Sequence, residues 1–314
     1  KERLGTGHAL MIASKYIGSD FICVYGDILF KEDFITSLLS KFKASDSFAM
    51  MALTESDTPK FFGSVTVSGD EVTGIFEKSD NPPSNLINTG IYCFKKESLS
   101  YINNTGISSR GEYELTDSLK MMMEGGENVK WMPLDGKWLD IGRPWDLIDA
   151  NMFFLDSLKH HVSLDSKISS DSKIGSPVFI DSLSVIDSSK ILPPCLISKN
   201  VNIGKNSRIS SSVVRGDVKI GKNCIIENSV IMNGVTIDDG SVVSFSIIGE
   251  NSEIGKNVTF ESKSDKNIYV EIKGGLVDSN RSQLGAIVGK NVKIWNNSKI
   301  NPGQKIESNS IIKK

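Results

Sequence analysis

Histidine and cysteine are scarce in this sequence, and neither is spaced for chemistry. Only three of the 314 residues are histidine, and none of them follows His161. We expect His8 to pack on an early helix rather than to act as a general base. The four cysteines show no C-x-x-C pair and are interpreted as small buried apolar residues in a reducing compartment. They are Cys23, Cys93, Cys195 and Cys224.

Excess positive charge and long apolar runs are missing as well. The formal net charge is -2, so the composition does not indicate a nucleic-acid-binding surface. No apolar run approaches the roughly 18 residues that a membrane-spanning helix needs. We therefore expect a soluble, cytoplasmic protein without nucleic-acid or membrane partners, and a length sufficient for about two domains.

The second half of the chain repeats one bulky apolar residue at intervals of six, six and five. The positions are Ile180, Ile186, Leu192, Ile197, Ile203, Ile209, Val214, Ile220, Ile226, Ile231, Ile237, Val243, Ile248, Ile254 and Phe260. A helix of about 3.6 residues per turn cannot keep this spacing on one face, whereas three short strands per coil of a parallel β-helix can. We predict a left-handed parallel β-helix of hexapeptide repeats over residues 156–314.

This repeat loses its phase at about residues 261–287 and resumes with Val288. Within the gap Ile268, Val270 and Ile272 alternate as in a hairpin strand. The turn sequence Gly-Lys-Asn recurs at coil corners, where we expect glycine and asparagine to accept positive φ.

Residues 1–155 carry the pattern of an α/β domain. A strand at residues 21–25, of the kind buried on both faces of a parallel sheet, lies between two segments with helical spacing. Ala9, Ile12, Ala13 and Tyr16 form the first helical stripe, and Phe34, Leu38, Leu39 and Phe42 form the second. Further strands are expected at residues 47–53, 63–67, 72–76 and 91–94, and a last helix begins at Pro144 with Trp145, Ile148, Met152 and Leu155 on one stripe.

Two aspartates follow apolar runs in this domain and are next to glycines. Asp27 comes after Gly26, and Asp140 lies in the run 138–142. Ligands of open α/β sheets bind beyond the strand ends, and two carboxylates there could share Mg²⁺ with substrate phosphates. Helix N-caps and turns also favour aspartate in such places, so spacing alone leaves both interpretations open.

Six short motifs, in this order, resemble the sugar-1-phosphate nucleotidylyltransferases. They are LGTGHAL at residues 4–10, VYGD at 24–27, FEK at 76–78, INTGIY at 87–92, GEYELTD at 111–117 and WLDIG at 138–142. The β-helix with QLGAIVG at 283–289 and INPG at 300–303 is similar to the archaeal bifunctional nucleotidylyltransferase/acetyltransferases. The resemblance implies a Rossmann-like nucleotidyltransferase domain followed by the β-helix.

The resemblance implies attack of a sugar 1-phosphate oxygen on the α-phosphorus of a nucleoside triphosphate, with release of pyrophosphate. Such chemistry depends on positioning and charge neutralisation. By position in the motifs, Asp27 and Asp140 would hold Mg²⁺, and Lys78 would neutralise the sugar phosphate. The implied substrate-binding residues are Gly5, Thr6, Gly26, Gly63, Glu77, Asn88, Gly90 and Glu112.

Several of these residues have structural alternatives. Glu77 and Lys78 are also compatible with a solvated charge pair, and Asn88 with a turn. Gly63 is compatible with a bulge. Glu112 is compatible with the third helical position of a capping box that begins at Ser109.

Two departures from the family pattern set further expectations. The family's first strand and its glycine-rich loop with arginine and lysine have no counterpart, and the sequence opens at Lys1, so we expect a fragment of a longer enzyme. In related acetyltransferases a histidine in the coils serves as the general base, but His160 and His161 precede the first coil. We therefore expect no acetyl transfer, and a homotrimer by analogy with related prisms.

The sequence favours one function and leaves alternatives open. The motif at 111–117 favours transfer from UTP or dTTP to glucose 1-phosphate or N-acetylglucosamine 1-phosphate, although the coil around residues 228–231 also resembles mannose-1-phosphate guanylyltransferases. The main rival is a non-catalytic assembly or regulatory subunit that has lost turnover. A third possibility is a hexapeptide acyltransferase with a degenerate front domain.

Overall fold

A computed structural model describes residues 4–313, and the chain divides into two compact units, Lys1–Asp140 and Ile141–Lys314. Each unit has its own hydrophobic core. Helix α5 (Asp146–Leu155) falls in the second unit by its contacts, although a division at residue 155 would group it with the first.

The first unit is built on a six-stranded sheet with the order β1-β6-β3-β7-β5-β4. Its strands are β1 (Phe21–Val24), β3 (Ala49–Glu55), β4 (Gly63–Ser68), β5 (Glu71–Glu77), β6 (Leu86–Phe94) and β7 (Val129–Pro133). Its helices are α1 (Thr6–Ala13), α2 (Asp33–Ala44), α3 (Leu99–Asn103) and α4 (Leu115–Glu124). A separate two-stranded ribbon joins β2 (Ile28–Leu29) to β8 (Leu139–Asp140).

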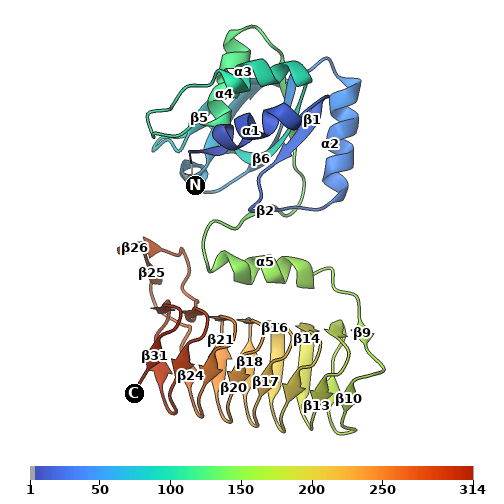
Figure 1. Cartoon of the computed structure of the whole chain (residues 1–314), viewed down its shortest axis with the longest axis vertical. Coiled ribbons are helices and arrows are strands. Elements are labelled where there is room, and N and C mark those ends of the chain that lie inside the picture. The colour runs from blue at the N-terminus through green and yellow to red at the C-terminus, as the bar shows by residue number, and fades with distance from the viewer. Residues whose placement is uncertain (1–3, 314) are drawn as a thin grey trace. The chain divides into compact units, whose positions relative to one another are not determined.

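Helices cover both faces of the sheet, because successive side chains of a strand point to opposite sides. In β3, Met51 faces a core shared with Leu10 of α1 and with α3 and α4. Its neighbour Met50 faces the opposite core, which contains Leu38 and Phe42 of α2. This three-layer arrangement, visible in Figure 1, confirms the α/β fold.

Strand direction differs from the expectation of a parallel sheet. Within the described residues β1 is an edge strand that pairs only with β6, and it does so in the antiparallel direction. Only β3 and β7 run parallel as neighbours. The prediction that residues 21–25 are buried on both faces was therefore wrong, and Val24 is 41% exposed. The predicted stripe of α1 was also wrong in part, since Ile12 and Tyr16 are exposed and Leu10 is the buried residue.

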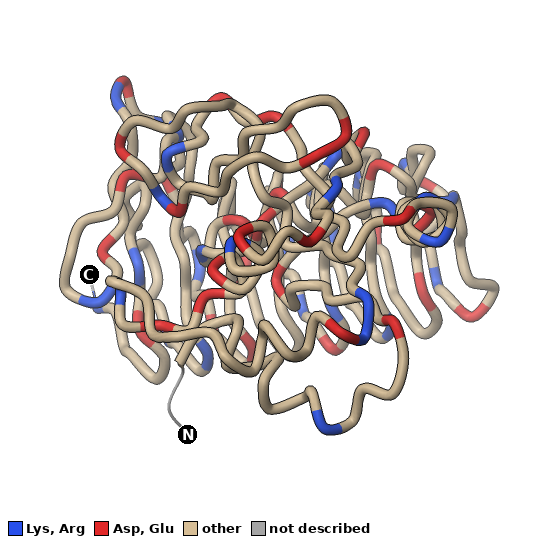
Figure 2. The backbone as a smooth tube through the Cα atoms, turned by 90° about the horizontal axis from the view of Figure 1, so that it is seen from above, with Lys and Arg blue, Asp and Glu red and all other residues tan. Residues whose placement is uncertain are grey.

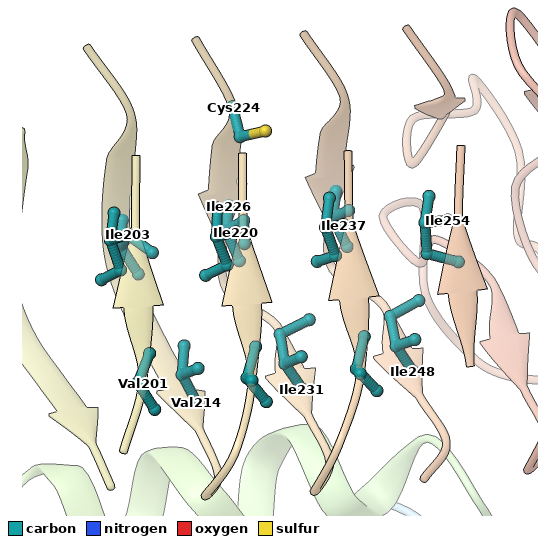
Figure 3. Packing of buried hydrophobic residues seen from close by; sticks show 14 of the residues in the cluster. Val201, Ile203, Val214, Ile220, Cys224, Ile226, Ile231, Ile237, Ile248 and Ile254 are labelled. Carbon is teal, nitrogen blue, oxygen red and sulfur yellow. The ribbon is translucent and has the colours of Figure 1, made fainter. Parts of the chain in front are cut away.

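The second unit is a β-solenoid whose coils stack in register. One stack joins Ile180, Ile197, Val214, Ile231 and Ile248, as the spacing predicted, and continues to Val288 and Ile306. A second stack contains Ile203, Ile220, Ile237 and Ile254 (Figure 3). Their side chains are almost completely buried, and each contributes about 1.5 to 3 kcal/mol of hydrophobic stabilisation.

Two sheets form the walls of this solenoid. The first contains β10 (Lys167–Ile168), β13 (Val185–Ile186), β15 (Asn202–Ile203), β17 (Lys219–Ile220), β20 (Thr236–Ile237), β23 (Glu253–Ile254), β28 (Lys293–Ile294) and β31 (Ile311–Ile312). The second contains β9 (His161–Val162), β11 (Lys173–Ile174), β12 (Val178–Ile180), β14 (Lys190–Ile197), β16 (Arg208–Val214), β18 (Ile225–Glu227), β19 (Val230–Ile231), β21 (Val242–Ser244), β22 (Ile247–Ile248), β24 (Thr259–Phe260), β27 (Ile287–Val288), β29 (Lys299–Ile300) and β30 (Lys305–Ile306).

One position of the predicted repeat is wrong. Ile191, not Leu192, occupies the interior and lies opposite Ile209 of the next coil. The register shifts between Leu192 and Cys195, where Pro193 and Pro194 add a residue to the coil. A sequence interval counted from one end cannot detect such a bulge.

The interruption at residues 261–287 contains the expected hairpin, formed by β25 (Tyr269–Ile272) and β26 (Gly275–Asp278). Its buried residue Val270 joins a cluster with Trp145, the N-cap of α5, with Ile148 of α5 and with the outward-facing Val230 and Ile247 of the coils. Helix α5 and the hairpin thus cover an apolar strip on the outside of the solenoid. Trp145, Ile148 and Leu155 of the predicted stripe are buried, whereas Met152 is only partly covered.

Asparagine and glycine occur at the coil corners for different structural reasons. Asn206, Asn223 and Asn257 have φ of 62°, 56° and 55°, as expected. Gly204 does not have positive φ; a Cβ there would stand 2.8 Å from the carbonyl carbon of Gly221 in the next coil. Close stacking of the coils, rather than φ, therefore requires this glycine. Acidic and basic residues are interspersed along the backbone (Figure 2).

Candidate active site

A cavity of about 730 Å³ opens in the first unit beside the ends of β1 and β6. All six sequence motifs contribute to its wall. The predicted residues that line it are Thr6, Gly26, Asp27, Gly63, Glu77, Lys78, Asn88, Gly90, Glu112 and Asp140. Gly5 does not line it.

The two aspartates lie at the same end of the β2–β8 ribbon, Asp140 within it and Asp27 directly before it. Ile28 lies opposite Asp140 in this antiparallel pair, so Asp27 is the immediate neighbour of the residue that faces Asp140. Both carboxylates are exposed to solvent and line the same cavity. Two residues 113 positions apart in the chain are thereby brought to one edge.

This donor set fits Mg²⁺ shared with a phosphate substrate. Among residues 4–313 no group of three or more His, Cys, Asp or Glu side chains is arranged to hold a metal ion alone. Mg²⁺ commonly takes one or two carboxylates and completes its shell with water and phosphate oxygens. Asp27 and Asp140 supply the two carboxylates that such a site needs.

The side chain of Glu77 lies against the backbone of Gly63. Gly63 pairs with Glu77 across β4 and β5, and a Cβ on Gly63 would lie 3.0 Å from Glu77 Oε1. The absence of that carbon lets the carboxylate lie over the strand. Lys78 follows with φ of 43°, in the left-handed region, and its N–H donates to the carbonyl of Phe62. A non-glycine residue there costs about 1 to 2 kcal/mol, so this backbone conformation is held in place by its surroundings.

Arg110, a cation that the sequence analysis missed, also lines the cavity. Its guanidinium lies 3.8 Å from Glu77 Oε2 and 3.1 Å from Glu114 Oε1. The second contact is an electrostatic contact without hydrogen-bond geometry, because Oε1 of Glu114 has no hydrogen-bond partner among the described residues. Burial raises the pKa of Glu114, and the charge of Arg110 opposes that shift. The sequence signal that could have identified Arg110 was its position as a basic residue directly before the GEYELTD motif.

Asn88 is fixed by two hydrogen bonds. Its Oδ1 accepts the N–H of Gly90 over 3.1 Å, and its Nδ2 donates to the hydroxyl of Tyr92 over 2.6 Å. Gly90 has φ of 80°, and a Cβ there would lie 2.5 Å from Cδ2 of Tyr25. Tyr25 lines the cavity, and burial raises its pKa to about 12.

Gly5 and Thr6 form the entry of α1. Gly5 has φ of 103°, and a Cβ there would lie 2.5 Å from the carbonyl oxygen of Tyr113. Thr6 Oγ1 accepts the N–H of Leu115 at the start of α4. Because α4 begins at Leu115, the capping box with Glu112 in its third position does not form.

Aromatic side chains close one side of the cavity. Phe62 and Trp138 both line it and meet edge to face, with ring centroids 5.5 Å apart. The indole N–H of Trp138 donates to the carbonyl of Thr89. Cys23 lines the cavity too, and burial raises its thiol pKa to about 11, so it is protonated at neutral pH. The sequence analysis did not predict Phe62, Trp138, Thr89 or Cys23 as residues of the site.

Other expectations concern residues outside the chemistry. His8 stacks on Tyr113 with ring centroids 5.8 Å apart, as a packing residue does. The four cysteines are free thiols, and three of them are buried. None of the helices within residues 4–313 is long and apolar enough to cross a lipid bilayer.

Comparison with known protein families gives two matches. A model described as "Nucleotidyl transferase" matches residues 1–157. A second model, described as "EIF2B subunit epsilon LbH domain", matches residues 181–273. The second match agrees with the left-handed β-helix predicted from the spacing.

Comparison with individual proteins finds archaeal relatives, of which two match nearly the whole chain and one matches about half of it. The Bifunctional protein GlmU of Methanocaldococcus jannaschii is 36% identical over 97% of this chain and 73% of its own length. A Bifunctional sugar-1-phosphate nucleotidylyltransferase/acetyltransferase of Sulfurisphaera tokodaii is 33% identical over 96% of this chain and 75% of its own. The Low-salt glycan biosynthesis nucleotidyltransferase Agl11 of Haloferax volcanii is 35% identical over 49% of this chain and 43% of its own.

Proposed function

Because the chain belongs to the nucleotidyl transferase family of sugar-1-phosphate nucleotidylyltransferases, we propose that its first unit carries out this reaction. The donor is UTP or dTTP, and the acceptor is glucose 1-phosphate or N-acetylglucosamine 1-phosphate. One observation carries the proposal: residues of all six motifs line the same cavity.

The reaction requires charge neutralisation more than covalent help from the protein. Asp27 and Asp140 would hold Mg²⁺, which would supply charge neutralisation for the phosphate groups. Lys78 and Arg110 are the two cations among the described residues that line the cavity, and in this proposal they neutralise the sugar phosphate. The attacking phosphate oxygen is thereby held near the α-phosphorus. Because both substrates are already bound, the translational and rotational entropy of a bimolecular encounter is lost before the chemical step.

The sugar binds at the β4–β6 side of the cavity in this proposal. Glu77 accepts hydrogen bonds from sugar hydroxyls, Asn88 contacts the sugar oxygens, and Glu112 also lines the cavity. Gly63 and Gly90 keep the backbone accessible beside them.

The nucleotide binds on the α1 side, next to Thr6. A Cβ on Gly26 would meet no atom within 4 Å, so the backbone beside Asp27 is open to a ligand. Gly5 supports this region from behind, since its close approach to Tyr113 fixes the entry of α1.

The test supplies full-length protein with each of the four nucleoside triphosphates and dTTP, a panel of sugar 1-phosphates and Mg²⁺. Pyrophosphate release is measured. We expect release with UTP or dTTP and with glucose 1-phosphate or N-acetylglucosamine 1-phosphate. Release confined to GTP with mannose 1-phosphate would replace the proposed specificity with guanylyl transfer, and no release with any pair would overturn the function.

A non-catalytic assembly or regulatory subunit is the second candidate. It is favoured by the match of residues 181–273 to a domain model named for an EIF2B subunit. Such a subunit would bind nucleotide or sugar phosphate without releasing pyrophosphate. The pyrophosphate assay therefore distinguishes it from an active enzyme.

The solenoid serves assembly in this proposal, and the division of labour falls between residues 1–155 and 156–314. We expect a homotrimer in the cytoplasm, and a monomeric mass in light scattering at micromolar concentration would contradict it. Because no histidine follows residue 161, we expect no thiol release from acetyl-CoA with glucosamine 1-phosphate.

A further inference from the structure

A chain of hydrogen-bonded side chains runs from Asn88 through Tyr92 to Tyr25 beside the cavity. Asn88 Nδ2 donates to Tyr92 Oη over 2.6 Å, and Tyr92 Oη donates to Tyr25 Oη over 3.1 Å. Tyr92 is fully buried, whereas Asn88 and Tyr25 line the cavity.

The direction of each bond follows from donor chemistry. The N–H of Gly90 points at Asn88 Oδ1, so the amide nitrogen of Asn88 faces Tyr92. An amide nitrogen only donates, and the oxygen of Tyr92 must therefore accept. The hydroxyl hydrogen of Tyr92 is then left for Tyr25. Burial keeps the pKa of Tyr92 well above its ordinary value, so this phenol remains a donor at neutral pH.

Hydrogen atoms remain for a ligand at both ends. Asn88 has a second Nδ2 hydrogen that none of these bonds uses. At the other end Tyr25 Oη accepts from Tyr92, so the hydroxyl hydrogen of Tyr25 itself is used by neither bond. Tyr25 lines the cavity, so this hydrogen is the donor at that end. The chain offers donors at both ends, which suits ligands with oxygen acceptors.

We propose that Tyr92, supported by Tyr25, is a positioning residue that holds the Asn88 amide with its second N–H toward an oxygen of the sugar 1-phosphate. This inference rests on the proposed function and adds the residues that fix its sugar contact. Tyr92 acts through Asn88 and does not touch the sugar. The atom that Asn88 meets is then an acceptor, such as a hydroxyl or acetamido oxygen, rather than a donor.

The experiment is a double-mutant cycle with Tyr92→Phe and Asn88→Ala in full-length protein. Tyr92→Phe removes one oxygen and keeps the ring, so the amide of Asn88 loses its partner. We expect the KM for the sugar 1-phosphate to rise about tenfold while the KM for the nucleoside triphosphate changes less than about twofold. In the Asn88→Ala background, Tyr92→Phe should leave the sugar KM unchanged.

Tyr101→Phe is the matched control. Tyr101 donates to Glu127 Oε1 over 3.2 Å and does not line the cavity, so both KM values should remain those of the wild type. Equal rises of both KM values in Tyr92→Phe, or an undiminished effect in the Asn88→Ala background, would overturn the positioning role.

A binding measurement separates this inference from the catalytic proposal. Glucose 1-phosphate and N-acetylglucosamine 1-phosphate are titrated calorimetrically in the presence of the α,β-methylene analogues of UTP and dTTP. If Tyr92→Phe weakens sugar 1-phosphate binding only when Asn88 is present, and no variant or wild type releases pyrophosphate, the positioning role is supported and the proposed reaction is overturned. If pyrophosphate is released but the effects of Tyr92→Phe and Asn88→Ala on sugar binding are additive, the reaction is supported and the positioning role is overturned. Absence of both binding and turnover would overturn both.

Discussion

Gly63 lies opposite Glu77 in the β4–β5 pair, at a distance where one added carbon would stand 3.0 Å from the Glu77 carboxylate. Gly63→Ala should displace the carboxylate while leaving the backbone unstrained. We expect the KM for the sugar 1-phosphate to rise roughly tenfold through loss of a charged hydrogen bond, with little change in Tm.

Gly106→Ala is the control for this substitution. A Cβ on Gly106 would meet no atom within 4 Å, and Gly106 does not line the cavity. If the two alanine variants had the same sugar KM, Glu77 would not be the sugar acceptor.

Asp27→Asn removes the charge of one of the two carboxylates on the β2–β8 ribbon. We expect pyrophosphate release to fall about 10² to 10³-fold, because the metal-bound phosphate charge loses a fixed partner. Asp57→Asn serves as control, since Asp57 is exposed and does not line the cavity. Unchanged release by Asp27→Asn across a Mg²⁺ titration would refute the metal assignment.

Gly90 is restricted twice, by a φ of 80° and by contact with Tyr25. Gly90→Ala should lower the free energy of unfolding by about 1 to 2 kcal/mol for the left-handed backbone and by about 1 to 3 kcal/mol more for overpacking. Gly69→Ala isolates the first effect, because Gly69 has φ of 61° and open space at its Cβ position. Equal losses in urea unfolding would show that contact with Tyr25 does not constrain the site.

Cys93 is a fully buried thiol whose pKa burial raises from 9.0 to about 11. The folded state therefore keeps a proton that the unfolded chain releases above about pH 9. The stability from this group is complete below pH 9 and is lost as the pH rises toward 11. Cys93→Ala lacks this titration, so the deficit in unfolding free energy of the variant should shrink by about 2 to 3 kcal/mol over that range.

Val65→Ala is the control for this pH dependence. Val65 is buried and does not titrate, so its deficit should stay constant between pH 9 and 11. A constant deficit for Cys93→Ala would instead mean that the Cys93 thiol of the wild type has the same pKa in the folded and unfolded states.

The solenoid could be predicted because its physical rule is local in the sequence. Every coil must bring one bulky residue inward at a fixed interval, and Ile197, Ile231 and Ile248 obey that rule. The rule failed at Leu192, where two prolines add a residue to the coil and Ile191 becomes the buried one. An interval pattern contains no information about bulges.

The cavity could be predicted only as far as motifs define it. Ten predicted residues line it, and so do Arg110, which stands directly before a motif, and Phe62, which lies in none of the six motifs. Their places depend on how loops fold over the sheet, which no short pattern encodes. Strand direction was unpredictable for a similar reason: the apolar run of β1 fits a buried parallel strand and an antiparallel edge strand equally well.

The stack of coils continues across the interruption without a change of register. Ile231 and Ile248 are neighbours 17 positions apart, and Ile248 is the neighbour of Val288, 40 positions further along the chain. Each coil is joined to the next by pairing at every wall, so extra chain at one corner is excluded from the pairing and does not disturb it. Such a corner is a natural point for grafting foreign segments, which could be carried on the prism with the spacing between coils preserved.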